Sequence, residues 1–252
     1  MNGMKPLLLS LVIGLLSPVV LADVVLTPVY EARGEARDIK TGELLYIEQH
    51  RRDGIDHSVD YFLPDGKLIV TNKQNFQYSA FVPTVEQTDL RDNERSGLQR
   101  KNNDWILFNN DERETIEHDD PLVASSGFDS FIRQNWTALA AGKYIDFDFA
   151  VPQSLLVAPL RLTPIDCKQS DISRVAADSL CLEVTPSSLF FSFFFDPIEV
   201  AYDRNDKRLL AYRGLTNLKD AEGETYEAEI FYTYETLDRT EPKKTALFNP
   251  VE

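Results

Sequence analysis

The chain has 252 residues, and 26 Lys and Arg against 41 Asp and Glu give it a net charge of −15. With 43% hydrophobic and 27% charged residues it has the composition of a globular protein, long enough for one large β domain or two smaller ones. Its acidity argues against nucleic-acid binding, which needs clustered Lys and Arg, and against docking on anionic lipid headgroups.

The first residues have the pattern of a secretory signal peptide. Lys5 precedes an apolar run over residues 7–16, and the small residues Val20 and Ala22 stand where a signal peptidase would require them. The alternative is a retained membrane anchor, but the run is shorter than the roughly 20 residues of a membrane span. We therefore predict a signal peptide over residues 1–22, without a lipobox cysteine. The mature chain, 23–252, is then a single domain in the periplasm or outside the cell, with no transmembrane segment.

The only two cysteines are Cys167 and Cys181. Export would place them in an oxidising compartment, where two thiols normally form a disulfide. The segments on either side have strand character, so the bridge would close a hairpin loop. A redox-active pair would need the closer Cys-X-X-Cys spacing, so we predict a structural disulfide.

Most of the chain alternates between apolar and polar residues, which is typical of half-buried strands. On the first of these segments Ala32, Gly34 and Ala36 alternate with charged residues. Turn sequences such as Pro64-Asp65-Gly66 separate the segments. Strands are expected over residues 30–37, 43–51, 55–63, 67–70, 84–91, 97–101, 105–109, 113–117, 145–151, 198–203 and 226–234. Short connections between them favour an antiparallel meander over βαβ units.

One segment departs from this alternation. Between Ser126 and Gly142 the apolar residues Phe128, Phe131, Ile132, Trp136 and Leu139 fall on a single helical face. A helix with one apolar face in a β protein must pack on a sheet. We therefore predict a mainly β fold, a curved antiparallel meander in the form of a half-open barrel around one amphipathic helix near 127–141.

A second unusual segment, residues 189–195, contains five phenylalanines. A short helix and a buried strand are both compatible with it. Such a run is too apolar to be left in water, so it either fills the core or lines an apolar site.

No motif indicates a reaction: the sequence contains no nucleophile elbow, nucleotide-binding loop or zinc-protease motif. The acidic stretch 111–120 is typical of a solvated loop, with weak calcium binding as its alternative. Asp146 and Asp148 share one face of a strand, so a carboxylate-dependent hydrolase is a third hypothesis behind the two given below. We predict no catalytic residue, no metal site and no cofactor, and favour a non-enzyme.

The order of the segments carries a resemblance. The signal peptide, the meander, the Trp-bearing segment 127–136 and the segments 196–198, 201–203 and 212–217 are similar to a group of uncharacterised exported bacterial proteins. The architecture resembles, more loosely, the LolA and LolB lipoprotein carriers of the periplasm, which hold acyl chains between a curved sheet and its helices. The resemblance implies an architecture and transfers no functional residue.

Two functions fit these observations best. One is a non-catalytic envelope protein that binds or carries an apolar lipid or acyl ligand, and the other is an envelope assembly factor that binds a protein partner through exposed strand edges. Small inward-facing residues on the first strand leave room that a helix or a ligand must fill. The apolar ligand site is predicted to comprise Phe128, Phe131, Ile132, Trp136, Leu139, Phe147, Phe149, Phe191 and Phe194.

Overall fold

The computed structural model describes residues 30–118, 121–176, 178–187 and 196–236. The predicted signal peptide and the whole phenylalanine run 189–195 lie outside the described residues. The described chain contains strands and three short helical segments. They are β1 (Tyr30–Asp38), β2 (Leu44–Asp53), β3 (Asp56–Phe62), β4 (Leu68–Asn75), β5 (Thr84–Asp89), β6 (Arg95–Lys101), β7 (Asp104–Asn109), β8 (Glu112–Thr115), β9 (Leu122–Ala124), α1 (Gly127–Gln134), α2 (Trp136–Ala140), β10 (Ile145–Val151), the 3-10 helix η1 (Pro152–Ser154), β11 (Leu156–Ile165), β12 (Ser179–Pro186), β13 (Ile198–Asp203), β14 (Leu209–Lys219) and β15 (Thr225–Thr236).

All strands belong to one 15-stranded sheet whose order is β8-β7-β6-β5-β4-β3-β2-β1-β15-β14-β13-β12-β11-β10-β9. Neighbours pair antiparallel except β9 and β10, which are parallel. The first strand pairs with the last, so β1 and β15 lie in the middle of the sheet and β8 and β9 form its two ends. The prediction of a mainly β, half-open barrel is confirmed.

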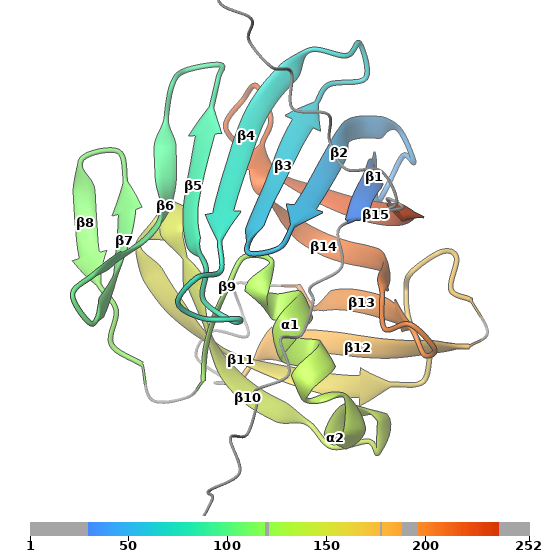
Figure 1. The fold of residues 1–252 in the computed structure, drawn as a ribbon. Helices are drawn as coiled ribbons and strands as arrows, with labels where there is room; N and C mark the ends of the chain where they lie inside the picture. The colour runs from blue at the N-terminus through green and yellow to red at the C-terminus, as the bar shows by residue number, and fades with distance from the viewer. Residues whose placement is uncertain (1–29, 119–120, 177, 188–195, 237–252) are drawn as a thin grey trace, which may run out of the picture.

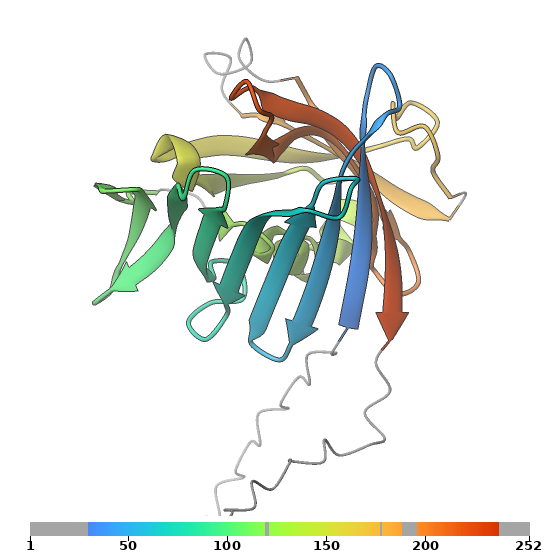
Figure 2. The same cartoon turned by 90° about the horizontal axis from the view of Figure 1, so that it is seen from above.

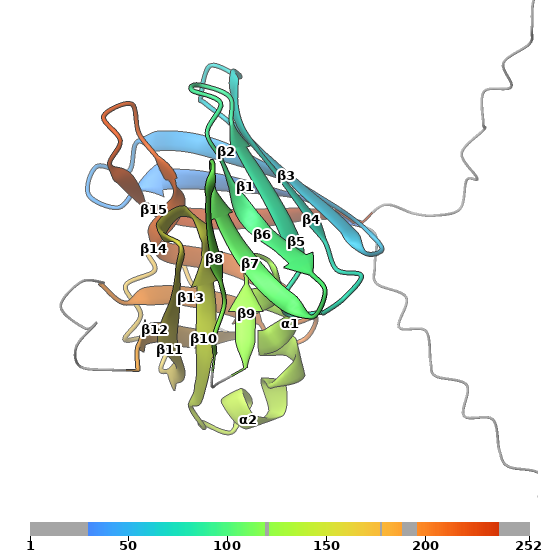
Figure 3. The same ribbon diagram turned by 90° about the vertical axis from the view of Figure 1, so that its left-hand side faces the viewer.

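The sheet bends into two arms that face each other. In Figure 1 strands β2–β5 run upright while β11–β14 run across the picture, and Figure 2 shows the two arms from above. Register shifts in β1–β2, β13–β14 and β14–β15 mark bulges, which increase twist and bend a strand. The helices lie between the arms, beside β9 and β10 in Figure 3.

The alternation predicted on the first strand is present in the structure. Ala32, Gly34 and Ala36 are buried on the concave face. A Cβ on Gly34 would lie 2.9 Å from the Tyr232 ring and 3.1 Å from a Glu48 oxygen. Side chains of the neighbouring strands, not the helices, therefore occupy the space that this glycine leaves.

The predicted helix over 127–141 is present as two short helices, α1 and α2, with a break at Asn135. The Asn135 side-chain amide donates a 2.9 Å hydrogen bond to the Phe131 carbonyl, which also accepts from the Asn135 backbone N–H. Such side-chain bonds compete with regular helix geometry. No helix within the described residues has the length and apolar character that crossing a membrane requires.

The sheet is not closed by hydrogen bonds, but side chains connect its two ends. Val85, Leu98 and Leu107 of the first arm share an apolar cluster with Leu122 and Ala150 of the second. The Asn109 amide also donates to the Gln153 carbonyl in η1, at 2.9 Å. One end of the half-open barrel is therefore closed by packing.

The predicted disulfide is confirmed: Cys167 and Cys181 are joined. Cys181 lies on β12, and Cys167 follows β11, the antiparallel neighbour of β12. The bridge therefore closes the connection between two paired strands, as expected.

Candidate functional site

The helices cover the part of the concave face that β10–β13 form. Phe131, Ile132 and Leu139 are fully buried there, against Phe147 of β10 and Leu162 of β11. The Phe131 and Phe147 ring centres are 5.3 Å apart. Leu180, Leu182, Val184, Val200 and Tyr202 complete the cluster. We call this part of the concave face the apolar half.

The structure brings together seven of the nine residues predicted to form the apolar site. They belong to one cluster, in which Phe131, Ile132, Leu139 and Phe147 are buried and Phe128, Trp136 and Phe149 are partly buried. Phe191 and Phe194 lie outside the described residues. The protein's own side chains fill the space between helix and sheet, so a ligand would enter only if a helix moved.

Trp136 is the first residue of α2 and is only partly buried. Its ring meets Tyr202 edge-on, with centres 6.3 Å apart, and the Lys207 ammonium lies 5.4 Å from its centre. It therefore stands at the margin of the apolar half, between the core and solvent.

The start of α1 is held by a close backbone contact and by side-chain hydrogen bonds. A Cβ on Gly127 would lie 1.9 Å from the Phe81 carbonyl oxygen, so only glycine permits this approach of the backbones. The Gln74 side chain donates to the Ser126 hydroxyl at 3.0 Å and accepts from the Ser126 backbone N–H at 3.2 Å. The helix pair is thus tied at its first residues to β4 and to the segment before β5.

Buried polar side chains line part of the concave face of β2–β5, beside an apolar cluster of Tyr46, Val59 and Tyr61. We call this polar part of the face the polar half. Glu48 is buried and accepts hydrogen bonds from His50 at 2.8 Å and from Tyr232 at 3.0 Å. His50 contacts His57 at 3.3 Å. Burial, with His50 and Arg52 nearby, lowers the pKa of His57 well below its usual value, so His57 is neutral at pH 7.

A second network in the polar half consists of amides. The Gln87 carbonyl oxygen accepts from Asn72 at 3.1 Å and from Asn217 at 2.8 Å, and Gln74 donates to Asn72 at 3.0 Å. Asn217 also donates to the Tyr61 hydroxyl. Because Gln74 holds Ser126 as well, this network anchors the start of α1.

An ion pair on α1 faces the junction of the two halves. Asp129 and Arg133 lie 2.9 Å apart. Desolvation raises the pKa of Asp129, while Arg133, Tyr202 and Arg52 oppose this shift. Neither this pair nor the two polar networks were predicted from the sequence. Alternation assigns polar strand residues to the solvent face, and only the i, i+2 spacing of Asn72 and Gln74, or of Glu48 and His50, would have marked a polar row.

Asp146, one of the two carboxylates considered for hydrolysis, forms an ion pair. Arg161, directly opposite Asp146 on β11, binds both of its oxygens, at 2.7 and 2.9 Å. These hydrogen bonds lower the pKa of Asp146, which is the wrong direction for a general acid. Of the acidic stretch, Asp119 and Asp120 lie outside the described residues.

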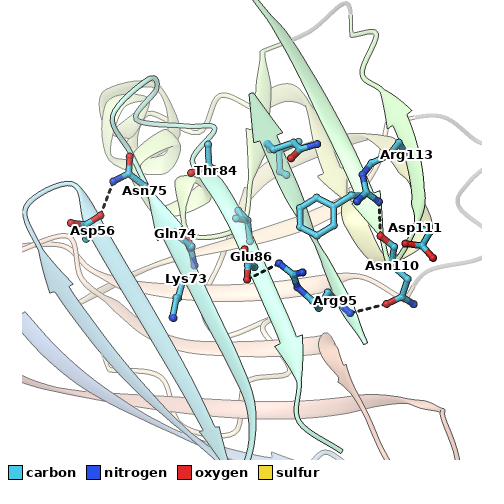
Figure 4. Close-up of a pocket in the computed structure, with 14 residues that line it drawn as sticks. Asp56, Lys73, Gln74, Asn75, Thr84, Glu86, Arg95, Asn110, Asp111 and Arg113 are labelled. Atoms are coloured by element: carbon cyan, nitrogen blue, oxygen red, sulfur yellow. Dashed lines mark hydrogen bonds and ion pairs between the residues drawn. The ribbon is translucent and has the colours of Figure 1, made fainter. Parts of the chain in front are cut away.

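A hollow of about 620 Å³ lies on the convex face over β4–β8 (Figure 4). Three acidic and three basic residues line it; Arg95 pairs with Glu86 at 3.0 Å, and Asp56 accepts from the Asn75 amide at 2.6 Å. Arg113 donates to the Asn110 carbonyl at 2.5 Å. This hollow contains none of the residues predicted for the apolar site, and its charges compensate one another.

Comparison with known proteins finds a similar fold but indicates no function. No protein-family model matches the chain, and no curated protein matches it. Among solved structures, the chain is similar to a beta-barrel-like protein of the domain of unknown function DUF1849 from Brucella abortus, with a TM-score of 0.50 and 7% sequence identity over 84% of this chain and 99% of that one. At this identity the likeness concerns the fold alone: a beta-barrel-like architecture shared with an uncharacterised bacterial protein.

Proposed function

We propose that the protein is a non-catalytic binding protein of the bacterial envelope that holds an acyl chain in the apolar half, with α1 and α2 as a lid. The observation that supports this most is the one-sided attachment of the helices. Their first residues are tied to the first arm of the sheet by Gly127, Ser126 and Gln74, whereas α2 covers the other arm through Leu139 and Trp136.

The break at Asn135 makes α2 the part of the lid that moves. Asn135 separates the two helices, so α2 can leave the sheet while α1 stays at its anchor. Movement of α2 would withdraw Leu139 and Trp136 from the apolar cluster and expose the part of Tyr202 that the Trp136 ring now meets. An acyl chain would restore that burial, at about 0.8 kcal/mol for each CH₂ removed from water.

The LolA and LolB carriers offer an architectural analogy, since a curved sheet there holds acyl chains against helices. The alternative, assembly through a strand edge, is less well supported. All four residues of the end strand β8 are exposed and three are charged, which is the usual protection against edge pairing. The other end strand, β9, is buried.

The two tryptophans of the chain make a direct test feasible. A Trp105→Phe variant keeps Trp136 as its only reporter, and a Trp136→Phe variant keeps Trp105, which lies on β7 outside the apolar half. Titration with oleate should change the Trp136 emission saturably, at one ligand per chain, and leave the Trp105 emission unchanged. No saturable response from Trp136 in the folded protein refutes an acyl site here and places the assembly function first.

The compartment has a separate test. A signal peptide over residues 1–22 predicts that exported protein begins at Asp23. Intact-mass measurement on protein recovered from the envelope should give the mass of residues 23–252, and a mass that includes residues 1–22 would refute cleavage.

A further inference from the structure

The described part of the loop closed by the disulfide, residues 166–176, covers the convex face of the sheet, behind the apolar half. Ile172 of this loop is buried with Cys181, Ala201 and Ala211. Cys181 is opposite Ala201, and Ala201 is opposite Ala211, so the three occupy one face of neighbouring strands. Leu182, Val200 and Tyr212, one position along each strand, face the helices instead.

Two buried carboxylates hold the backbone of this loop in place. Glu199 of β13 accepts from the Ser170 hydroxyl and from the Asp171 backbone N–H, the latter at 2.9 Å. Glu229 of β15 accepts from the Ser173 backbone N–H at 2.6 Å and from its hydroxyl at 2.5 Å. The residue that follows Ser173 is therefore fixed relative to β15.

That residue is Arg174, whose guanidinium carbon lies 4.3 Å from the centre of the Phe231 ring on β15. It borders a hollow of about 410 Å³ lined by Arg33, Glu35, Arg37, Arg174, Phe231 and Thr233. Glu35 of β1 is directly opposite Phe231. The disulfide loop and two strands thus bring three guanidinium groups to one depression.

The charges of this hollow do not balance. Glu35 is shared between Arg33, at 3.6 Å, and Arg37, at 3.4 Å. Within the described parts of the chain, no carboxylate is placed to form an ion pair with Arg174. The Arg33 and Arg37 side chains keep 45% and 40% of their surface exposed. The hollow therefore has a local excess of cations, in a chain whose net charge is −15.

We propose that this hollow binds a phosphate group, as a small phosphate ester or as the headgroup of a phospholipid. Guanidinium groups present planar pairs of N–H donors that match phosphate oxygens. Arg174 is held by its loop and its ring contact, so little side-chain freedom is lost on binding. The site is on the convex face, opposite the proposed acyl site, and does not depend on that proposal.

Titration calorimetry with glycerol 3-phosphate at low ionic strength tests whether the hollow binds a small phosphate ester. Flotation with phosphatidylglycerol vesicles, against phosphatidylcholine vesicles, tests the headgroup source. The Arg174→Gln and Arg33→Gln variants should each weaken binding about tenfold, since each removes charge-assisted hydrogen bonds. Arg95→Gln is the matched control, because Arg95 is also exposed on the convex face but is paired with Glu86 outside this hollow.

Binding of either probe that is lost in Arg174→Gln and kept in Arg95→Gln supports the site, and the probe that binds identifies the source. The proposal is overturned if neither probe binds the folded protein, or if the Arg174 and Arg95 variants lose the same affinity, which would mean unspecific attraction to surface arginines.

Discussion

The two halves of the concave face follow the same rule of alternation and bury opposite chemistry. Under the helices, β10–β13 turn Phe147, Leu162, Leu182 and Val200 inward. Across the sheet, β2–β5 turn amides, histidines and a glutamate inward. The apolar half is stabilised by removing carbon from water. The polar networks gain only from hydrogen bonds that replace those to water, although an apolar cluster of Tyr46, Val59 and Tyr61 lies beside them. An inward position in this sheet therefore determines burial but not polarity.

The two halves also contact the helices through different interactions. The polar half binds the start of α1 through directed hydrogen bonds from Gln74 to Ser126. The apolar half holds α2 through non-directional packing of Leu139 and Trp136. Hydrogen bonds fix a position, whereas an apolar surface accepts any apolar cover of similar shape. An anchor in one half and non-directional packing in the other is the arrangement that the proposed lid needs.

The largest expected effect comes from deleting a ring in the apolar half. Phe147→Ala should lower the free energy of unfolding by about 3–5 kcal/mol, because the fully buried ring leaves a cavity among Phe128 and Phe131. Chemical denaturation measures this. Ile55→Ala, at a side chain that is 49% exposed, is the control and should change stability by less than about 0.5 kcal/mol. Equal effects of the two substitutions would show that the apolar half is not a packed core.

The disulfide lies behind the apolar half and should affect stability without affecting the acyl site. Replacing both Cys167 and Cys181 by Ser should cost about 3 kcal/mol by the chain-entropy argument for a loop of this size. The response of Trp136 to oleate should persist in this variant. If the response disappears while the protein stays folded, the convex loop and the concave site are not independent.

A smaller loss is expected in the polar half. Gln87→Ala removes the acceptor shared by Asn72 and Asn217 and leaves the buried Asn72 amide without it, at a cost of about 1–3 kcal/mol. Chemical denaturation of this variant and of Phe147→Ala compares the loss of unfolding free energy in the two halves. A Gln87 effect as large as that of Phe147 would contradict a polar half stabilised only by exchange of hydrogen bonds.

The smallest effect concerns pH and belongs to the polar half alone. Because the pKa of His57 is lowered in the folded state, the unfolded chain binds the proton more readily. The stability linked to His57 is therefore fully present above about pH 6.5 and falls as the pH decreases below it, by at most about 1.4 kcal/mol per pH unit. Denaturation at pH 7, 6 and 5 should show this slope, and His57→Gln should remove it. The same slope in His57→Gln would assign it to another group.

Much of the fold could be predicted from the sequence, because it depends on local signals. Alternating residues such as Ala32, Gly34 and Ala36 predicted strands, turn sequences predicted an antiparallel meander, and the spacing from Phe128 to Leu139 predicted a helical segment on a sheet. The break of that segment at Asn135 was not predicted, since it depends on a side-chain hydrogen bond that has no periodic signature. The pairing of the first strand with the last also has no local signal.

The site could be predicted only in part. Periodicity placed Phe131, Trp136 and Phe147 on faces that can meet, and the structure brings them together. The buried Glu48 network was not predicted, because a polar residue in an alternating strand is normally assigned to solvent. Nor was the role of the disulfide loop: the spacing of the cysteines predicts a closed loop but not the face that it covers or the arginines that it approaches.

Hydrogen–deuterium exchange with and without oleate tests most directly the claim that α2 covers a replaceable apolar half. We predict faster exchange of the α2 amides when oleate is bound, slower exchange in β10–β12, and no change in β2–β5. Unchanged exchange in α2 and β10–β12 at saturating oleate, or protection that appears in the polar half instead, would contradict it.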